Sequence, residues 1–266
     1  MNDLQMTLVK MMKSIHEICE KNGLRYYIVG GTMLGAIRHH GFIPWDDDMD
    51  ISMPRDDYEI FIHLSEDELP EWMEIHTPES SNYDLTASKV MDKTTTFIEA
   101  RKDKNIVEGA YIDVFPLDGI GDNLTLSKFR MNLIQFITFM LRANQGTSNL
   151  NNIPKKLFAT IAPHLDRKAM FLTLENYTTK YKYEKCKYVA NTVGRYAQKE
   201  MTLRSYYGKP QLYQFENFEF YGVEKPDEFL KGVYGDYMKL PSESERKLKH
   251  HSYFNPNLPY RNYSEE

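Results

Sequence analysis

Apolar residues recur along the chain with two different periods, and these predict an alternation of helices and strands. A spacing of three and four residues is typical of a helix with one buried face, whereas strict alternation or a short β-branched and aromatic run is typical of a strand. The expected strands are residues 24–29, 49–53, 72–76, 85–91, 94–99, 110–115 and 215–223. The expected helices are a helix from Leu4 that stops at Asn22-Gly23, one from a Thr32 cap to about Arg38, one after Pro54 with Tyr58, Phe61 and Ile62 inward, and residues 124–142, 153–181 and 226–234.

This order of elements predicts an α+β fold with a mixed β-sheet core flanked by helices and an additional helical region. We expect residues 1–121 to form the catalytic core and residues 122–185 to form a helical, basic insertion. Residues 186–266 are expected to return a strand and a helix to the core. The polar, proline-interrupted tail from Pro241 is expected to form a lid or an extended arm.

Charge is distributed unevenly along the 266 residues. The whole chain has 33 basic and 38 acidic side chains and a formal net charge of −5, so overall charge does not favour a nucleic-acid partner. Residues 123–182, however, contain nine basic and two acidic residues. A specialised role for this segment is therefore worth considering.

Cysteine usage and hydropathy indicate a cytoplasmic protein. Cys19 and Cys186 have no zinc-site spacing and form no disulfide framework, and Cys19 lies on a helical apolar pattern typical of a core position. Charged residues interrupt the first apolar stretch, so no secretory signal is expected, and no apolar run reaches the length of a membrane span.

Four aspartates lie within five positions in the stretch GFIPWDDDMDIS, residues 41–52. If this stretch is extended, Asp48 and Asp50 share one face with their Cα atoms about 7 Å apart, Asp46 can join them, and Asp47 faces away. Paired carboxylates raise each other's pKa unless a cation compensates. Mg²⁺ binds one or two carboxylates together with substrate phosphates, and two such ions assist in-line displacement at phosphorus.

Other residues complete a possible phosphate site. Gly30-Gly31 and the Thr32 hydroxyl offer donors at the start of a helix, where N–H groups attract anions. Asp113 is the single charge within the apolar run YIDVF, residues 111–115. Each feature alone also fits a structural role: a plain turn, a solvated acidic loop, or a buried, hydrogen-bonded aspartate. Their joint order favours a metal site.

Three blocks of sequence resemble the LicD family, a branch of the nucleotidyltransferase superfamily with distant fukutin-type relatives. The blocks are GTMLGAIRHHGFIPWDDDMD at residues 31–50, YIDVFPLD at residues 111–118 and YGDYMKLP at residues 234–241. The resemblance implies a nucleotidyltransferase-like fold of the DNA polymerase β type. It also implies Mg²⁺-dependent transfer of phosphocholine from CDP-choline to a sugar hydroxyl of a cell-surface glycan precursor, such as a teichoic acid or lipooligosaccharide, with release of CMP.

The same resemblance implies roles for individual residues. Asp48 and Asp50 would hold two Mg²⁺ ions, for which Mn²⁺ can substitute, while Asp113 would ligate one ion and accept the proton of the acceptor hydroxyl. Gly30, Gly31 and Thr32 would cradle the donor phosphates. Further substrate-binding candidates are Arg38, Trp45, Lys89, Tyr234, Asp236 and Tyr237.

Several of these candidates have a structural alternative. Arg38 and Lys89 either neutralise phosphate charge or form surface ion pairs, and Trp45 either supports the acidic loop or encloses the donor. His250 and His251 belong either to a closing arm or to a solvated tail. An aromatic cage can hold a quaternary ammonium group, but 19 tyrosines, 14 phenylalanines and two tryptophans leave its members open.

The basic segment also has two interpretations. The apolar helix expected at residues 124–142 and its basic neighbours either bring the enzyme to a polyprenyl-linked glycan acceptor at the inner face of the membrane, or form a core helix under a solvated basic face. Three other functions stay open: nucleotidyl transfer to a small alcohol, sugar or antibiotic, phosphotransfer from another CDP-alcohol such as CDP-ribitol, and a glycan- or nucleotide-binding module without chemistry. The presence of all three acids argues against the last.

Overall fold

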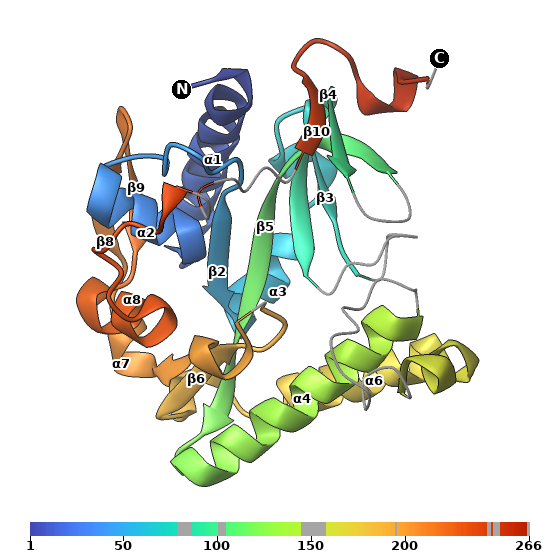
Figure 1. Ribbon diagram of the computed structural model, residues 1–266, viewed down its shortest axis with the longest axis vertical. Coiled ribbons are helices and arrows are strands. Elements are labelled where there is room, and N and C mark those ends of the chain that lie inside the picture. Colours follow the sequence, from blue (N-terminus) through green and yellow to red (C-terminus); the bar gives the residue numbers. More distant parts are fainter. Residues whose placement is uncertain are drawn as a thin grey trace.

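A mixed β-sheet forms the centre of the molecule (Figure 1). The computed structural model describes residues 1–78, 87–100, 105–144, 158–194, 196–243, 246 and 251–264. Along the sheet the strands follow the order β1 (Tyr27–Ile28), β2 (Asp50–Pro54), β5 (Asn105–Gly121), β4 (Ser88–Ala100) and β10 (His251–Asn255). The expected α+β class with a mixed sheet is confirmed.

Further strands pair with the two long inner strands of this path or with each other. β3 (Met73–His76) pairs with β4, β6 (Tyr188–Asn191) pairs with β5, and β7 (Met201–Leu203) pairs with β6. β2 and β5 are parallel, whereas the other pairs are antiparallel. The parallel pair requires a crossover connection, which α3 (Arg55–Ile62), β3 and β4 supply.

The long N-terminal helix follows directly from the sequence pattern. In α1 (Asp3–Asn22) the apolar residues at helical spacing are buried, among them Leu8, Ile15 and Cys19. Asn2 and Gln5 form a capping box, and Gly23 ends the helix in the left-handed conformation (φ 63°). α1 and α3 both pack against β5 and supply one side of the main core.

A second group of elements surrounds the start of β2. α2 (Gly30–His39) packs on β2 and on the hairpin of β8 (Gln211–Phe215) and β9 (Phe218–Gly222). α8 (Pro226–Tyr234) contacts α2 and α7 (Arg204–Tyr207). Figure 1 shows these elements together beside β2, on the opposite side of the sheet path from β4 and β10.

The additional helical region has its own small core. α4 (Leu124–Asn144) and α6 (Arg167–Thr178) pack together at the far end of β5, away from the α2–α8 group (Figure 1). Met131, Ile134 and Leu174 are buried there together with Ile120 of β5. Within the described ranges, no helix combines the length and the apolar character needed to cross a membrane.

Several expected elements have different bounds. Residues 88–100 form one strand rather than two, because a register shift between Asp92 and Phe97 keeps both halves paired with β5. The single strand expected at residues 215–223 is wrong, since Glu216 adopts a positive φ of 55° and turns the chain into the β8–β9 hairpin.

The helix expected at residues 153–181 is also wrong as one unit. In its described part a 3-10 turn (Ala162–His164) containing Pro163 precedes α6, and Asp166 caps α6 by accepting from the N–H groups of Lys168 and Ala169. Strand β10 was not expected. Within the tail expected to form a lid or an extended arm, residues 251–255 pair with β4 as a strand.

Candidate functional site

The parallel pairing of β2 with β5 brings two of the predicted acids together. Asp50 opens β2, and its register partner on β5 is Asp113. The N–H of Asp113 donates to the carbonyl of Met49 at 3.3 Å, which fixes the register beside the acids. Paired positions on neighbouring strands present their side chains on the same face, so the two half-buried carboxylates are neighbours.

Asp48 lies in the segment that leads into β2 and belongs to the same acidic group. Burial raises the pKa of Asp50 well above its ordinary value, and the charges of Asp48 and Asp113 raise it further, followed by those of Asp46 and Glu200. These carboxylates therefore share one region of strongly negative potential. An arrangement of this kind favours either protonation of one member or a bound cation.

The pKa of Asp113 shows how attraction and repulsion balance in this group. The pKa rises from 3.8 to about 6 in total: burial raises it most, Lys89 lowers it, and Asp48 raises it. Lys89 is the register partner of Asp113 on β4. Its ammonium is thus a basic group that the sheet itself supplies beside Asp113.

Lys89 forms an ion pair, which was one of its two alternatives, but the pair is buried rather than at the surface. Its Nζ donates to Oε1 of Glu108 at 2.8 Å and lies 3.4 Å from the ring centroid of Tyr111. A buried lysine needs a counter-charge, and Glu108 provides it from the same sheet. Neutralisation of substrate phosphate by Lys89 stays a prediction.

The glycine turn lies directly against the acids. Gly30 opens α2 with a φ of 58°, and a Cβ added there would lie 3.0 Å from Oδ2 of Asp50. A Cβ on Gly31 would lie 2.6 Å from Oδ2 of Asp46. Glycine at both positions thus leaves room for carboxylate oxygens at the start of α2, where backbone N–H groups attract anions. That the turn cradles donor phosphates stays a prediction.

Thr32 ties the helix to the acid strand instead of capping the helix. α2 begins at Gly30 with Val29 as its N-cap residue, so the expected cap at Thr32 is wrong. The Thr32 side chain is buried, and its hydroxyl accepts a hydrogen bond from the N–H of Asp50 at 2.9 Å. The glycine turn and the acids are therefore held in one register.

Asp47 makes a contact that sequence reasoning did not anticipate. Its buried carboxylate contacts Nδ1 of His251 on β10 at 2.5 Å. The His251 ring also packs against Phe97 of β4. His251 therefore belongs to an ordered arm that reaches the acidic segment, whereas His250 lies outside the described residues.

Glu200 is a second group that the sequence pattern did not reveal. It ends the 3-10 turn Ala197–Glu200, and its Oε1 accepts from the N–H of Tyr196 at 2.7 Å. Burial raises the pKa of Glu200 to about 7, and its charge acts on Asp50. No local motif marks it, because only the folding of β6 and β7 onto β5 brings this turn to the acids.

Two tyrosines stand beside the acids. The rings of Tyr196 and Tyr234 meet edge to face, with centroids 5.5 Å apart. Burial raises the pKa of Tyr234, and its neighbour Tyr196 and the charges of Asp50 and Asp46 raise it further. The predicted candidate Tyr234 thus lies at the site, and Tyr196 is an aromatic partner that was not expected.

The remaining candidates lie on α2, just after α2, or in the loop that follows α8. Arg38 donates from Nη1 to the carbonyl of Tyr237 at 2.7 Å. Burial lowers the pKa of Arg38, and the nearby Tyr234 partly offsets this. Trp45 is half-buried against the main core, with the edge of His39 near its ring. Tyr237 is buried and its hydroxyl donates to Asp227, whereas Asp236 is exposed. The Arg38 guanidinium is therefore held by the loop after α8, while the Tyr237 hydroxyl is turned toward α8.

No ready-made three-ligand metal site exists among the His, Cys, Asp and Glu side chains of the described ranges. Mg²⁺ in phosphoryl-transfer sites commonly takes only one or two protein carboxylates and draws its other ligands from phosphate and water. The acids at β2 and β5 are hard oxygen donors with crowded negative charge, and they fit that mode of binding.

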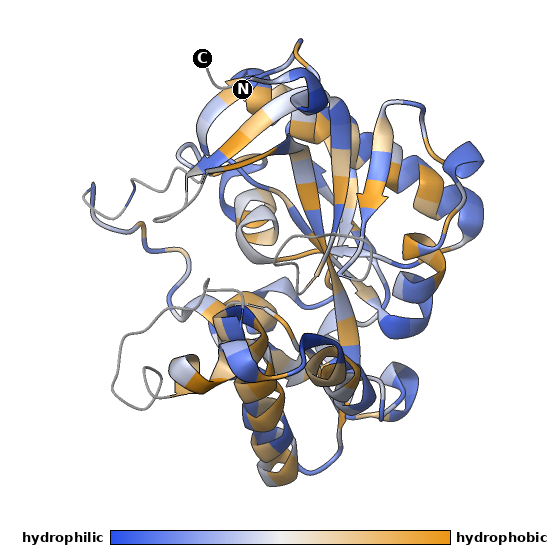
Figure 2. Cartoon of the chain, turned by 90° about the vertical axis from the view of Figure 1, so that its right-hand side faces the viewer, coloured by the Kyte–Doolittle hydropathy of each residue, from blue (hydrophilic) through white to orange (hydrophobic). Residues whose placement is uncertain are grey.

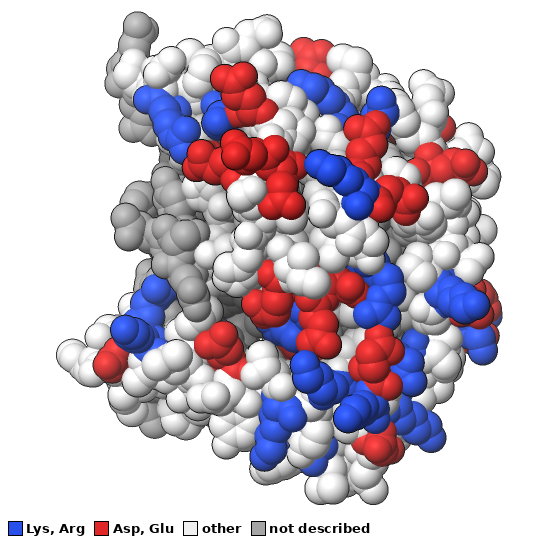
Figure 3. Space-filling view, turned by 180° about the vertical axis from the view of Figure 1, so that it is seen from behind, with Lys and Arg blue, Asp and Glu red and all other residues white. Residues whose placement is uncertain are grey.

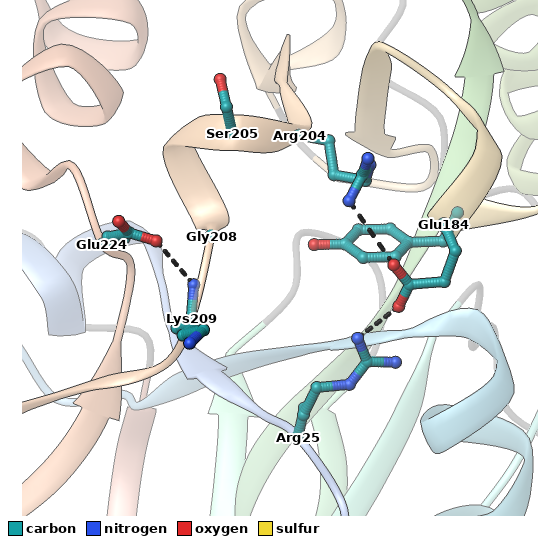
Figure 4. Close-up of a pocket in the computed structure, with 8 residues that line it drawn as sticks. Arg25, Glu184, Arg204, Ser205, Gly208, Lys209 and Glu224 are labelled. Atoms are coloured by element: carbon teal, nitrogen blue, oxygen red, sulfur yellow. Dashed lines mark hydrogen bonds and ion pairs between the residues drawn. The ribbon is translucent and has the colours of Figure 1, made fainter.

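A cavity of about 300 Å³ lies elsewhere, beside α7 and Arg25 (Figure 4). Arg25 bridges Asp57 at 2.7 Å and Glu184, and Glu184 also pairs with Arg204. Lys209 donates its N–H to Glu224 across the same cavity. Its charged groups satisfy one another, which is the pattern of a structural junction.

A family model matches the part of the chain that contains Asp48, Asp50 and Asp113. Residues 23–135 match the family model described as "LicD/FKTN/FKRP, nucleotidyltransferase domain". The chain is 29% identical over 265 residues to the Lipopolysaccharide cholinephosphotransferase LicD of Haemophilus influenzae, covering 94% of this chain and 96% of that protein.

Shorter matches concern other relatives. The Uncharacterized protein RP689 of Rickettsia prowazekii is 46% identical over 61 residues, which is 23% of this chain and 22% of that protein. The human Ribitol 5-phosphate transferase FKRP is 45% identical over 40 residues, which is 15% of this chain and 8% of that protein.

Proposed function

We propose that this chain, which carries a LicD-family domain over residues 23–135, transfers phosphocholine from CDP-choline to a sugar hydroxyl of a cell-surface glycan precursor and releases CMP. At the level of reaction class, similarity over nearly the whole chain to a cholinephosphotransferase confirms the prediction of a transferase of phosphate-containing groups. The acceptor, a teichoic acid or lipooligosaccharide precursor on a polyprenyl carrier, is part of the proposal.

One observation carries this proposal. The register of β2 with β5 places Asp50 beside Asp113, with Asp48 close by and the Gly30-Gly31 turn facing them. Acids on adjacent strands next to a glycine turn are also what a nucleotidyltransferase-like fold of the DNA polymerase β type would supply, and we propose that fold for the core.

The residues act as follows in the proposed reaction. Asp48, Asp50 and Asp113 would hold Mg²⁺, which when bound would neutralise charge on the donor phosphates. Asp113 would accept the proton of the acceptor hydroxyl. The N–H groups at Gly30 and Gly31 and the Arg38 guanidinium would orient the diphosphate, since both types of donor recognise phosphate oxygens.

The choline head requires a different environment from the diphosphate. Quaternary ammonium groups bind to aromatic faces, and Tyr196 and Tyr234 place two rings within the field of Asp50 and Asp46. Negative charge and aromatic rings together favour a permanent cation. This supports CDP-choline as the donor over an uncharged alcohol.

A second donor keeps a specific basis. The match to a ribitol 5-phosphate transferase over 40 residues favours CDP-ribitol as the alternative donor. Ribitol has no cationic head, so it gains nothing from the tyrosine pair beyond apolar contact. The two donors are therefore separable by competition.

Product analysis tests the proposed function. With CDP-choline labelled in the choline group, we expect label in the glycan and stoichiometric CMP. Asp50→Asn should fold and lose turnover, while the matched control Asp67→Asn, an exposed acid in a 3-10 turn, should keep it. Transfer of CMP itself to the acceptor, or full activity of Asp50→Asn, would refute the assignment.

A further inference from the structure

The outer face of α4 is apolar although it is exposed. Leu126, Phe129 and Phe136 leave 54%, 68% and 41% of their surface accessible, and Leu133 lies between them half-buried. Spacings of three and four residues place these four side chains on one face of the helix. The opposite face carries Met131 and Ile134 into the small core.

The apolar face continues onto the next segment of the chain. Phe158 packs edge to face on Phe136 with ring centroids 5.1 Å apart, and Ile161 is 46% exposed one helical turn later. We call these six residues, Leu126, Phe129, Leu133, Phe136, Phe158 and Ile161, the apolar ridge. Figure 2 shows many hydrophobic positions along the helices at the lower end of the molecule. A contiguous exposed apolar surface of this kind marks an interaction site more often than single exposed residues do.

A basic cavity adjoins the ridge at the N-terminal end of α4. It has a volume of about 490 Å³ and is lined by Leu126 of the ridge. Its basic lining residues are Arg130, Lys180, Lys182 and Lys185, against one lining acid, Asp122. Figure 3 shows Lys and Arg gathered at the lower end of the molecule, to which the end of β5 and the start of α4 belong.

The cavity is a built structure rather than a chance gathering of lysines. Arg130 donates to the carbonyl of Ile120 at 2.7 Å, and its guanidinium lies 4.3 Å from the centroid of the Tyr181 ring. The Asp122 carboxylate is engaged by the N–H of Lys187 at 2.7 Å. Lys182 pairs with Asp56 at 2.9 Å, so Arg130, Lys180 and Lys185 supply the positive charge of the cavity against the single lining acid.

We infer that the apolar ridge and the basic cavity form a docking surface for a membrane that contains anionic phospholipids. The ridge would enter the boundary between headgroups and acyl chains, while the cavity would take a lipid phosphate. Charge selects this occupant, because anionic headgroups neutralise the cavity, whereas a second copy of the same surface would bring the same positive charge.

The position of the docking surface suits the proposed function. The biological use of the surface rests on that function, whereas its binding to membranes does not. Gly121 at the cavity is eight residues beyond Asp113 on one continuous strand, a separation of about 26 Å at the rise of a β-strand. A glycan anchored in the bilayer would cross this distance to reach the acids. Vesicle binding itself requires no turnover, so it and the transfer reaction can fail independently.

Vesicle flotation tests the inference. The full chain should float with vesicles of phosphatidylcholine and phosphatidylglycerol in equal parts, and should not float with phosphatidylcholine alone. The double variant Lys180→Gln/Lys185→Gln should lower the partition coefficient roughly thirtyfold, since each basic residue near an anionic surface strengthens membrane binding by a factor of roughly five. Phe129→Ser should lower it roughly tenfold through lost apolar burial.

Matched controls lie on other faces of the molecule. Ile60→Ser removes an apolar side chain of similar exposure from α3, and Lys13→Gln/Lys21→Gln removes two charges from α1; both should bind like the unaltered chain. Binding that is unchanged in the Lys180/Lys185 and Phe129 variants, or no binding to anionic vesicles, would overturn the inference. A third outcome would also overturn the inference: light scattering shows that the unaltered chain self-associates, and Phe129→Ser abolishes this self-association but leaves vesicle binding unchanged. Transfer to a short, water-soluble acceptor should be the same in all these variants.

Discussion

Replacing Asp113 by asparagine should stabilise the ligand-free protein at neutral pH and remove phosphocholine transfer. The carboxylate is half-buried, and burial and the charge of Asp48 both raise its pKa. Asparagine has nearly the same shape but no charge, so the substitution tests the repulsion without opening a cavity. A residue held in place for chemistry rather than for stability should behave in this way.

The magnitude follows from the pKa of Asp113, which rises from 3.8 to about 6 on folding. A carboxyl group with a raised folded-state pKa is protonated in the native state while it is ionised in the unfolded state, so stability falls as pH rises from about 4 to about 6. Above this range the loss of stability caused by ionised Asp113 has reached its full value. The substitution should therefore stabilise the fold by about 3 kcal/mol at pH 8 and by about half of that at pH 5.

Urea denaturation of the metal-free protein at the two pH values measures this difference. Asp67→Asn, which changes an exposed acid, should shift the midpoint little at either pH. Magnesium chloride should stabilise the unaltered chain and narrow its deficit relative to Asp113→Asn, because a bound cation relieves the repulsion. Equal stability of the variant and the unaltered chain at pH 8, or destabilisation by more than about 1 kcal/mol, would refute the electrostatic reasoning.

Other predictions concern the frame and the substrate contacts. Arg55→Met should lower the free energy of unfolding by about 3 to 5 kcal/mol in urea, because the buried carboxylate of Asp118, which accepts from Arg55 at 2.7 and 2.8 Å, would lose its counter-charge; a loss below about 1 kcal/mol would contradict this. Tyr196→Phe should keep KM for CDP-choline within about twofold, whereas Tyr196→Leu should raise this KM roughly threefold to thirtyfold through loss of a cation–π contact. Neither substitution should change the inhibition constant of CDP-ribitol as a competitor. Equal effects of both substitutions on KM would exclude a ring contact. His251→Ala should lower the free energy of unfolding by about 1.5 to 3 kcal/mol, since it removes a charge-assisted contact with Asp47. The same variant should also produce CMP more slowly. Unchanged stability and turnover together would show that β10 does not support the acidic segment.

Local pattern determined much of the fold before any tertiary contact was considered. The helical spacing from Leu4 to Ile18 and the stop at Gly23 specify α1, because capping and burial act within a few residues along the chain. The apolar runs around Asp50 and Asp113 specify β2 and β5 in the same way. The acids of the site were visible for that reason: they interrupt short segments whose strand character is local.

Local pattern failed wherever a distant segment decided the outcome. Residues 88–100 form one strand only because β5 pairs with both of its halves, and Lys89 is buried only because Glu108 lies within reach. The contacts of His251 and Glu200 with the acidic region join positions more than a hundred residues apart. No periodicity encodes such a pairing.

The sequence by itself therefore determined which residues are candidates for the chemistry of this protein and which elements hold several of them. Only the tertiary structure decided that Asp50 and Asp113 face each other, that Lys89 opposes them, and that Tyr196 joins Tyr234 beside them. The physical reason is the difference between the two kinds of interaction. Helix and strand formation depend on neighbours in the chain, whereas strand register and side-chain pairing are set by the packing of the whole core, which no short window of sequence contains.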